Sequence, residues 1–170
     1  MAIFLTGGTG KTSSRIAQLL QRTGIPFLIG SRRGEAAAPD GMIAVKFDWL
    51  DASTFRNPFE HKFPRDETIS AMYLVPPEVA IPGPPTNAFI DYAIKHGVQR
   101  FVLLAGNHVE PGGPQLGEVW QHLLDSAVEY CVLRPTWFMG KTCPEPMLTD
   151  LPNACLRREF LRGRAPSHDP

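Results

Sequence analysis

AIFLTGGTGKT, residues 2–12, is the stretch of sequence that decides the fold. Four apolar residues run directly into a turn with three glycines, and the residues from Lys11 onward have helical spacing. This pattern predicts a buried strand that turns sharply into the N-terminus of a helix. Glycines let the backbone approach an anion without an intervening Cβ, and the free N–H groups and positive dipole end of a helix attract phosphate. The stretch therefore predicts a phosphate-binding turn.

Two phosphate-binding motifs compete for this turn. A Walker A loop needs a glycine five positions before Gly10, where this chain has Leu5, so that motif is excluded. The spacing Gly7-x-x-Gly10-x-x-Ser13 instead fits a dinucleotide-binding turn, with a small serine at the position that packs the helix on the sheet. A purely structural turn stays open as an alternative. The expected cofactor contacts in this stretch are Gly7, Thr9, Gly10, Lys11 and Thr12.

Apolar strands alternate with helical segments along the rest of the chain. After the first strand we expect strands at 26–30, 42–47, 69–75, 100–105 and 130–133 and helices at 11–22, 86–96 and 116–128, with a short helical turn at 51–55. The proline clusters at 76–77 and 82–85 are interpreted as loops. Six strands in this alternation predict the α/β class, with a doubly wound parallel sheet of the Rossmann type.

Composition narrows the kinds of partner. The 170 residues are 43% hydrophobic, which suits one globular domain with a sizeable core. Because 17 acidic residues balance 17 basic ones, neither nucleic acid nor an anionic membrane is an expected partner, and a small molecule is favoured. Three cysteines without a C-x-x-C pair indicate reduced thiols and no metal site, and no apolar run approaches a membrane span. A cytoplasmic location is expected.

The regular alternation ends near Gly140. Beyond it, short polar stretches are interrupted by prolines, and 157–164 is rich in arginine. We therefore expect two parts, a dinucleotide-binding domain at 1–139 and an irregular tail at 140–170.

Residues after the second and third strands favour one type of dinucleotide. In a Rossmann-type fold, an acidic residue after the second strand binds the ribose 2′-hydroxyl of NAD, whereas a basic residue accommodates the 2′-phosphate of NADP. This chain has Ser31-Arg32-Arg33 there, so NADP(H) is expected. Asp48 could accept from the adenine amino group or serve only as a turn residue. Pro76, directly after the strand at 69–75, is also expected to line the cofactor site.

Catalytic residues are harder to identify. Short-chain carbonyl reductases use a Tyr-x-x-x-Lys pair, but the three tyrosines here are followed by Pro77, His96 and Arg134 at the fourth position. Ordinary alcohol–ketone chemistry is therefore disfavoured, and the catalytic residues stay unassigned. Glu118 and His122 have i, i+4 spacing and could form an acid–base couple or a plain surface pair.

Three residues are candidates for substrate contact. Asn107 and His108 lie on the loop after the strand at 100–105, at the sheet edge where such folds bind ligands. Trp137 follows the last strand and could line an aromatic substrate pocket or belong to the core.

Several blocks together resemble a known family. These blocks are LTGGTG at 5–10, PFLIGSR at 26–32, KFDWLD at 46–51, FVLL at 101–104 and VLRPTWFM at 132–139. They are similar to the NmrA-like reductases of fungal ergot alkaloid biosynthesis, the festuclavine and agroclavine dehydrogenases. The resemblance covers about residues 1–139. It departs from the family at Glu118, where members carry lysine, and in the tail, so we expect a chain that is shortened or altered at its C-terminus, with the substrate region largely missing.

The resemblance implies NADPH-dependent reduction of an iminium formed from chanoclavine-I aldehyde, which gives a clavine. An upstream oxidoreductase of the same pathway is then a candidate partner. Hydride addition to a cationic iminium gives a neutral amine without a proton donor, which agrees with the missing tyrosine–lysine pair. The alternative from another class is a non-catalytic NADP-binding sensor or regulator with the same NmrA-like fold, or an inactive truncated form.

Overall fold

The computed structural model describes residues 1–136. Its strands are β1 (Ala2–Leu5), β2 (Phe27–Ser31), β3 (Ala44–Lys46), β4 (Ile69–Leu74), β5 (Arg100–Leu104) and β6 (Glu129–Leu133). Its helices are α1 (Lys11–Arg22), α2 (Asn57–Glu60), α3 (Gly83–Lys95) and α4 (Leu116–Asp125), with short 3-10 turns at Gly34–Ala37 and Ala52–Thr54. None of the helices in this part of the chain is long and apolar enough to cross a membrane.

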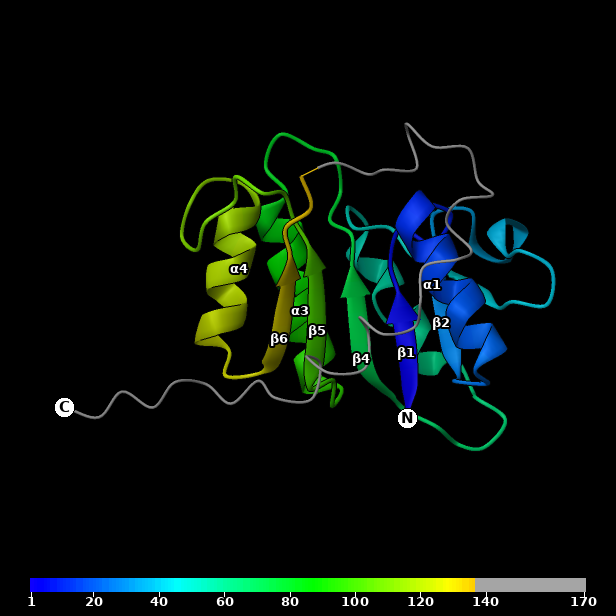
Figure 1. The fold of residues 1–170 in the computed structure, drawn as a ribbon. Helices are drawn as coiled ribbons and strands as arrows, with labels where there is room; N and C mark the ends of the chain where they lie inside the picture. The colour runs from blue at the N-terminus through cyan, green and yellow to red at the C-terminus, as the bar shows by residue number, and fades with distance from the viewer. Residues whose placement is uncertain (137–170) are drawn as a thin grey trace. The chain divides into compact units, whose positions relative to one another are not determined.

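All six strands form one parallel sheet in the order β3-β2-β1-β4-β5-β6. This confirms the predicted doubly wound α/β fold. The chain moves outward in one direction from β1 to β3 and in the other from β4 to β6, so the order reverses between β1 and β4. Because every strand runs the same way, the loops after β1, β4 and β5 lie at one edge of the sheet, the upper edge in Figure 1. In such folds ligands bind at this carboxyl edge, beside the reversal.

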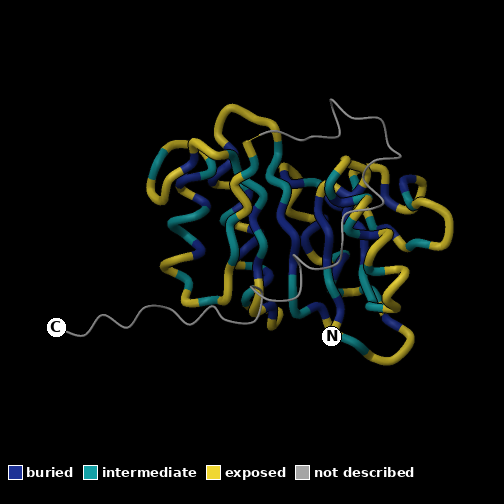
Figure 2. Tube along the Cα trace, in the orientation of Figure 1, coloured by how far each residue is buried: buried dark blue, intermediate teal, exposed yellow. Residues whose placement is uncertain are grey.

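Helices cover both faces of the sheet. On one face Ala17 of α1 packs with Leu5 and Ile29. On the other, α3 and α4 pack against a larger core that contains Phe4 and Phe101. Buried residues follow the central strands in Figure 2, while the exposed residues are mainly in loops and on the outer sides of helices. The sheet is therefore buried between two apolar cores, one on each face.

The start of α3 differs from the sequence prediction. We expect a loop at 82–85 and a helix from Thr86, but α3 begins at Gly83 and includes Pro84 and Pro85 in its first turn. Proline is tolerated there because the first N–H groups of a helix have no partner within the helix, and the fixed φ of proline suits the helix. The hydroxyl of Thr86 donates to the Pro82 carbonyl at 2.7 Å and closes this turn.

Two other elements are three residues shorter than expected. The helix predicted at 116–128 ends at Asp125, and Ala127 has a φ of 52°, a left-handed conformation that cannot continue a helix. The strand predicted at 42–47 is shortened to Ala44–Lys46, because a turn closes between the Met42 N–H and the Pro39 carbonyl at 3.0 Å. The predicted tail, 140–170, and the end of the predicted domain at 139 lie outside the described residues.

Candidate functional site

The turn after β1 has room only for glycine at two positions. Gly7 has a φ of 63°, which side-chain-bearing residues rarely adopt. At Gly8, a Cβ would lie 1.9 Å from Cγ2 of Ile29, so the turn packs directly on the end of β2. The Gly10 N–H donates to the Gly7 carbonyl at 2.7 Å and closes the turn. The glycines therefore bring bare backbone to the carboxyl edge of the sheet.

Thr6 and Ser13 hold this turn against the sheet. The Thr6 hydroxyl donates to the Tyr73 carbonyl at 3.0 Å and accepts from the Val75 N–H at 2.7 Å, which joins the ends of β1 and β4. The Ser13 hydroxyl donates to the Thr6 carbonyl at 2.7 Å. Ser13 is fully buried, in agreement with its predicted packing role. Sequence reasoning missed Thr6, although a hydroxyl residue between an apolar strand and a glycine turn is a usable signal.

The N-terminus of α1 presents free hydrogen-bond donors. Gly10 is the N-cap, and no side chain within 1–136 caps the helix. The first helical hydrogen bond runs from Ser14 N–H to the Gly10 carbonyl, and the N–H groups of Lys11 and Thr12 have no partner in the described part of the chain. No acidic residue lies in the first turn. This arrangement, with the helix dipole behind it, can bind a phosphate.

Two arginines follow β2 at the same edge. Arg32 and Arg33 are both exposed, and neither takes part in an ion pair among residues 1–136. The Arg33 N–H donates to the Ser31 hydroxyl at 3.3 Å, which shapes the turn that carries them. With no ion-pair partner in the described part of the chain, their guanidinium groups can bind an anionic group at this edge of the sheet.

Asp48 follows β3 and Pro76 follows β4, two strands that β2 and β1 separate in the sheet. One carboxylate oxygen of Asp48 accepts from the Leu50 N–H at 3.0 Å, so Asp48 does serve as a turn residue, and its contact with adenine stays a prediction. The indole N–H of Trp49 donates to the Val75 carbonyl at 3.1 Å. This bond links the segment after β3 to the end of β4, directly before Pro76.

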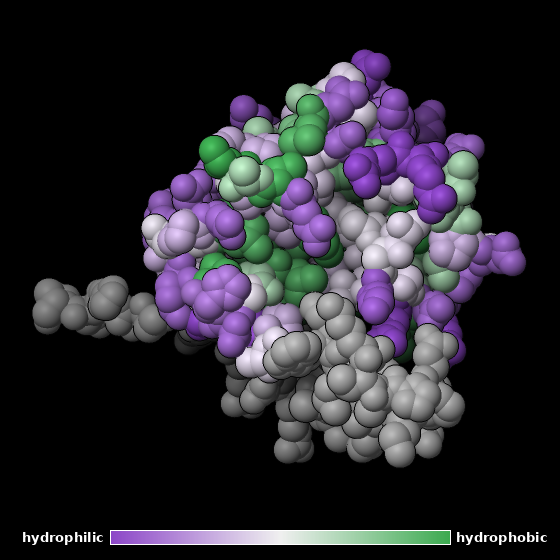
Figure 3. Space-filling view, turned by 90° about the horizontal axis from the view of Figure 1, so that it is seen from above, coloured by the Kyte–Doolittle hydropathy of each residue, from purple (hydrophilic) through white to green (hydrophobic). Residues whose placement is uncertain are grey.

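Asn107 and His108 lie exposed on the loop between β5 and α4, as predicted. A Cβ on Gly106 would lie 2.9 Å from Cε1 of His108, so the imidazole ring packs over bare backbone. The Asn107 carbonyl accepts from Nη2 of Arg134 at 2.6 Å. Figure 3 looks down on this edge and shows apolar surface gathered beside polar surface. The exposed apolar side chains of the loop after β4 are Val79 and Ile81.

The predicted pairing of Glu118 with His122 is wrong. His122 Nε2 instead lies 2.8 Å from Oδ1 of Asp91 on α3, and this contact joins α4 to α3. Glu118 lies against Gly83, where a Cβ would be 2.4 Å from its Oε2. His122 therefore links two helices rather than forming an acid–base couple.

Two groups, one buried and one half-buried, have raised pKa values. Burial raises the pKa of the Tyr73 hydroxyl, and a hydrogen bond with the Thr12 side chain partly offsets this effect. Burial likewise raises the pKa of the Cys131 thiol, so this cysteine is protonated at neutral pH. The other two cysteines and Trp137 lie outside the described residues.

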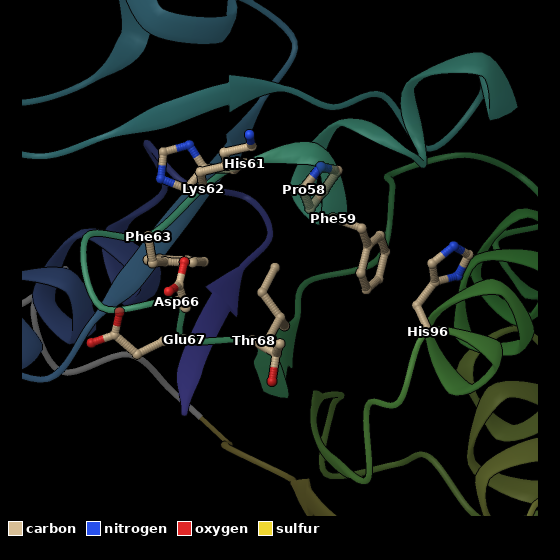
Figure 4. A pocket seen from close by; sticks show the side chains of 10 residues that line it. Pro58, Phe59, His61, Lys62, Phe63, Asp66, Glu67, Thr68 and His96 are labelled. Carbon is tan, nitrogen blue, oxygen red and sulfur yellow. The ribbon is translucent and has the colours of Figure 1, made fainter.

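A cavity of about 360 Å³ lies at the opposite edge of the sheet. Figure 4 shows that its walls come from α2, the segment before β4 and the end of α3. Phe59 of α2 and His96 at the end of α3 line it from one side. It contains none of the predicted site residues. Its ionisable side chains have mixed charges, since Lys62 is basic and Asp66 and Glu67 are acidic, so it offers no clear preference for a phosphate.

Comparisons with known proteins identify close relatives. No family model matches the chain. Over 148 residues it is 45% identical to festuclavine synthase II of Penicillium roqueforti, and the aligned stretch covers 86% of this chain and 51% of that protein. It is 42% identical over 141 residues to agroclavine dehydrogenase of Claviceps purpurea, covering 82% and 47%. It is 41% identical over 152 residues to festuclavine dehydrogenase of Aspergillus fumigatus, covering 86% and 50%.

Solved structures share the fold at low identity. Triphenylmethane reductase of Citrobacter, complexed with NADP(H), matches with a TM-score of 0.66 at 15% identity, over 88% of this chain and 54% of that one. An NADPH-dependent quinone oxidoreductase of Escherichia coli, complexed with NADPH, matches with a TM-score of 0.62 at 22% identity, over 80% of this chain and 49% of that one. The chain spans about half the length of the curated relatives it matches. Over that length the chain is a homologue of the festuclavine and agroclavine dehydrogenases, which confirms the resemblance predicted from its sequence.

Proposed function

We propose that this chain binds NADP(H) at the turn after β1 and acts as an oxidoreductase in clavine formation. The proposal rests on two features that the described residues bring to one sheet edge. The N-terminus of α1 behind the glycine turn has no side-chain cap among residues 1–136, and Arg32 and Arg33 after the next strand have no ion-pair partner there. The names of the relatives support the clavine substrate class.

The described residues fit a nicotinamide dinucleotide with a 2′-phosphate. The free N–H groups of Lys11 and Thr12 suit a pyrophosphate, because they point out of the helix where its dipole is positive. Arg32 and Arg33 suit a second phosphate, and no carboxylate stands beside Ser31 to favour a ribose hydroxyl. We therefore propose NADPH rather than NADH.

The proposed reaction reduces an iminium carbon derived from chanoclavine-I aldehyde. When bound, NADPH supplies a hydride, and its electron pair forms the new C–H bond. The π electrons of the C=N bond become the lone pair of a neutral amine, so no proton has to be donated. The missing Tyr-x-x-x-Lys pair is compatible with this chemistry, and the protein's work is to hold the two reactants in position.

We propose that Asn107 and His108 contact the substrate. Both are exposed at the carboxyl edge, on the loop after β5, where ligands of such folds bind. They carry polar groups that can orient a substrate without a catalytic acid. Trp137 is proposed as a further contact from the sequence alone.

The test is an assay with the purified full chain, NADPH and chanoclavine-I aldehyde, in which NADPH consumption and clavine formation are followed together. We expect both, and a variant with Arg32→Ala and Arg33→Ala should need more NADPH for the same rate. Binding of NADPH without any clavine would instead favour a non-catalytic NADP-binding regulator with the same fold. Absence of NADPH binding would contradict both functions.

A further inference from the structure

The loop between β5 and α4 is attached to the end of β6 by backbone and side-chain bonds. The Ala105 N–H donates to the Leu133 carbonyl at 2.9 Å, where the loop leaves the sheet. One residue later, Nη2 of Arg134 donates to the Asn107 carbonyl at 2.6 Å and to Oε1 of Glu110 at 2.5 Å. One nitrogen of Arg134 therefore holds the loop at two points, on both sides of His108.

Arg134 also contacts α4. Its guanidinium carbon lies 5.6 Å from the centre of the Trp120 ring, within the range of a cation–π contact. The guanidinium is thus held between the loop and the helix that follows it.

The loop is otherwise held mainly by bonds within itself. The Val109 N–H donates to the Gly106 carbonyl at 3.1 Å, and the Gly113 N–H donates to the Glu110 carbonyl at 3.1 Å. These bonds fix the shape of two short turns, and Val109 is buried beneath them. These bonds within the loop do not attach the Asn107–Glu110 segment to β6. The Arg134 side chain makes that attachment.

We propose that Arg134 is a positioning residue that holds Asn107 and His108 in place for the ligand at the carboxyl edge. The proposal rests on the proposed function for the identity of that ligand. Arg134 itself need not touch the ligand, because its two bonds end on the loop. A loop that moves by about 1 Å can lose about 100-fold in rate when it orients a substrate.

A matched ion pair at the other end of the same two strands provides the control. Arg100 Nε lies 2.6 Å from Glu129 Oε2, so this pair also joins β5 to β6 with close geometry. It lies at the amino edge, away from the loop. Both pairs are largely exposed and contribute little to global stability, so Arg134→Met and Arg100→Met should unfold at similar urea concentrations.

Two readouts test the proposal in these variants. The first is hydrogen exchange of the amides at 106–113, which should be about tenfold faster in Arg134→Met than in Arg100→Met, because a bond from a charged donor is lost. The second is the affinity of the NADP⁺-loaded protein for festuclavine, which should fall about tenfold in Arg134→Met alone while NADP⁺ affinity is unchanged. Arg134→Lys keeps a donor at this place and should restore part of both effects.

Exchange at 106–113 that is equal in the two methionine variants would overturn the proposal, whether or not the chain is active. Faster exchange with unchanged festuclavine affinity would also overturn it, because Arg134 would then stabilise the loop without positioning it for a ligand. If the unmutated protein binds NADP⁺ but not festuclavine, the proposed function fails separately, and the exchange comparison still decides whether Arg134 holds the loop. Should Arg134→Met fail to fold, Glu110→Gln, which weakens one of the two bonds, takes its place with the same criteria.

Discussion

The hydroxyl of Thr6 is one of the contacts that fix the glycine turn to the sheet. It is fully buried and satisfies two backbone groups of β4, the Tyr73 carbonyl and the Val75 N–H. A buried backbone group that loses its partner costs free energy, because water cannot replace the lost bond. The position of the glycine turn therefore depends in part on Thr6, which precedes the glycines.

Thr6→Val keeps the shape of this side chain and removes both bonds. We expect it to lower the free energy of unfolding by about 1–3 kcal/mol, because the Val75 N–H is left unpaired in the interior. Urea unfolding followed by circular dichroism measures the change. Thr23→Val is the matched control, since the Thr23 hydroxyl donates to the Leu19 carbonyl at 2.9 Å in an exposed position. An equal loss in both variants would contradict the role of Thr6.

Contacts between distant residues explain what sequence reasoning could not predict at this scale. The glycine turn and the buried Ser13 were predictable because the whole motif lies within twelve residues. The partner of His122 was not, because Asp91 lies on another helix, whereas helical spacing identifies neighbours on one helix only. Arg134 was missed for the same reason, since its partner Asn107 lies on the loop after another strand.

At the scale of elements, α1 and β4 pack together next to the glycine turn. Tyr73 of β4 is buried on the face that α1 covers, and the Thr12 side chain at the start of α1 hydrogen-bonds with it. Burial disfavours the phenolate, which is why the pKa of Tyr73 is raised above its ordinary value of 10.0. The folded protein therefore holds this proton more tightly than the unfolded chain does.

This shift predicts a loss of stability in alkali. Below the ordinary tyrosine pKa both states keep the proton, and the stabilisation is fully present. As the pH rises past that value the unfolded state releases its proton first, so the stability falls until the pH has passed the raised pKa of the folded state. Tyr73→Phe should therefore show a shallower decline of urea midpoint above pH 10.0 than the unmutated protein. An identical decline in the two proteins would show that Tyr73 does not titrate in this way.

The boundaries of the elements were predictable where local signals agreed. The bounds of α1 match the prediction at both ends, because a glycine precedes Lys11 and Thr23-Gly24 follows Arg22. The start of α3 was missed because prolines disrupt helices at most positions but not in the first turn. The end of α4 depends on the left-handed conformation of Ala127, which an alanine in the sequence does not predict.

At the scale of the whole sheet, the strand order brings the proposed cofactor and substrate residues to one edge. The turn after β1, the arginines after β2 and the loop after β5 all follow carboxyl ends of parallel strands. The alternation of strands and helices in the sequence predicted this arrangement. It could not predict the bonds that hold the loop after β5, because these depend on the packing of β6 beside β5.

The central claim is that this edge binds NADP(H). The most direct measurement is calorimetric titration of NADPH and NADH into the unmutated protein and into a variant with Arg32→Ala and Arg33→Ala. We predict that the unmutated protein binds NADPH at least about tenfold more tightly than NADH and that the double variant loses this preference while it keeps its NADH affinity, because we propose that the arginines contact only the 2′-phosphate. Equal affinities of the unmutated protein for the two dinucleotides, or an undiminished preference in the double variant, would contradict the account.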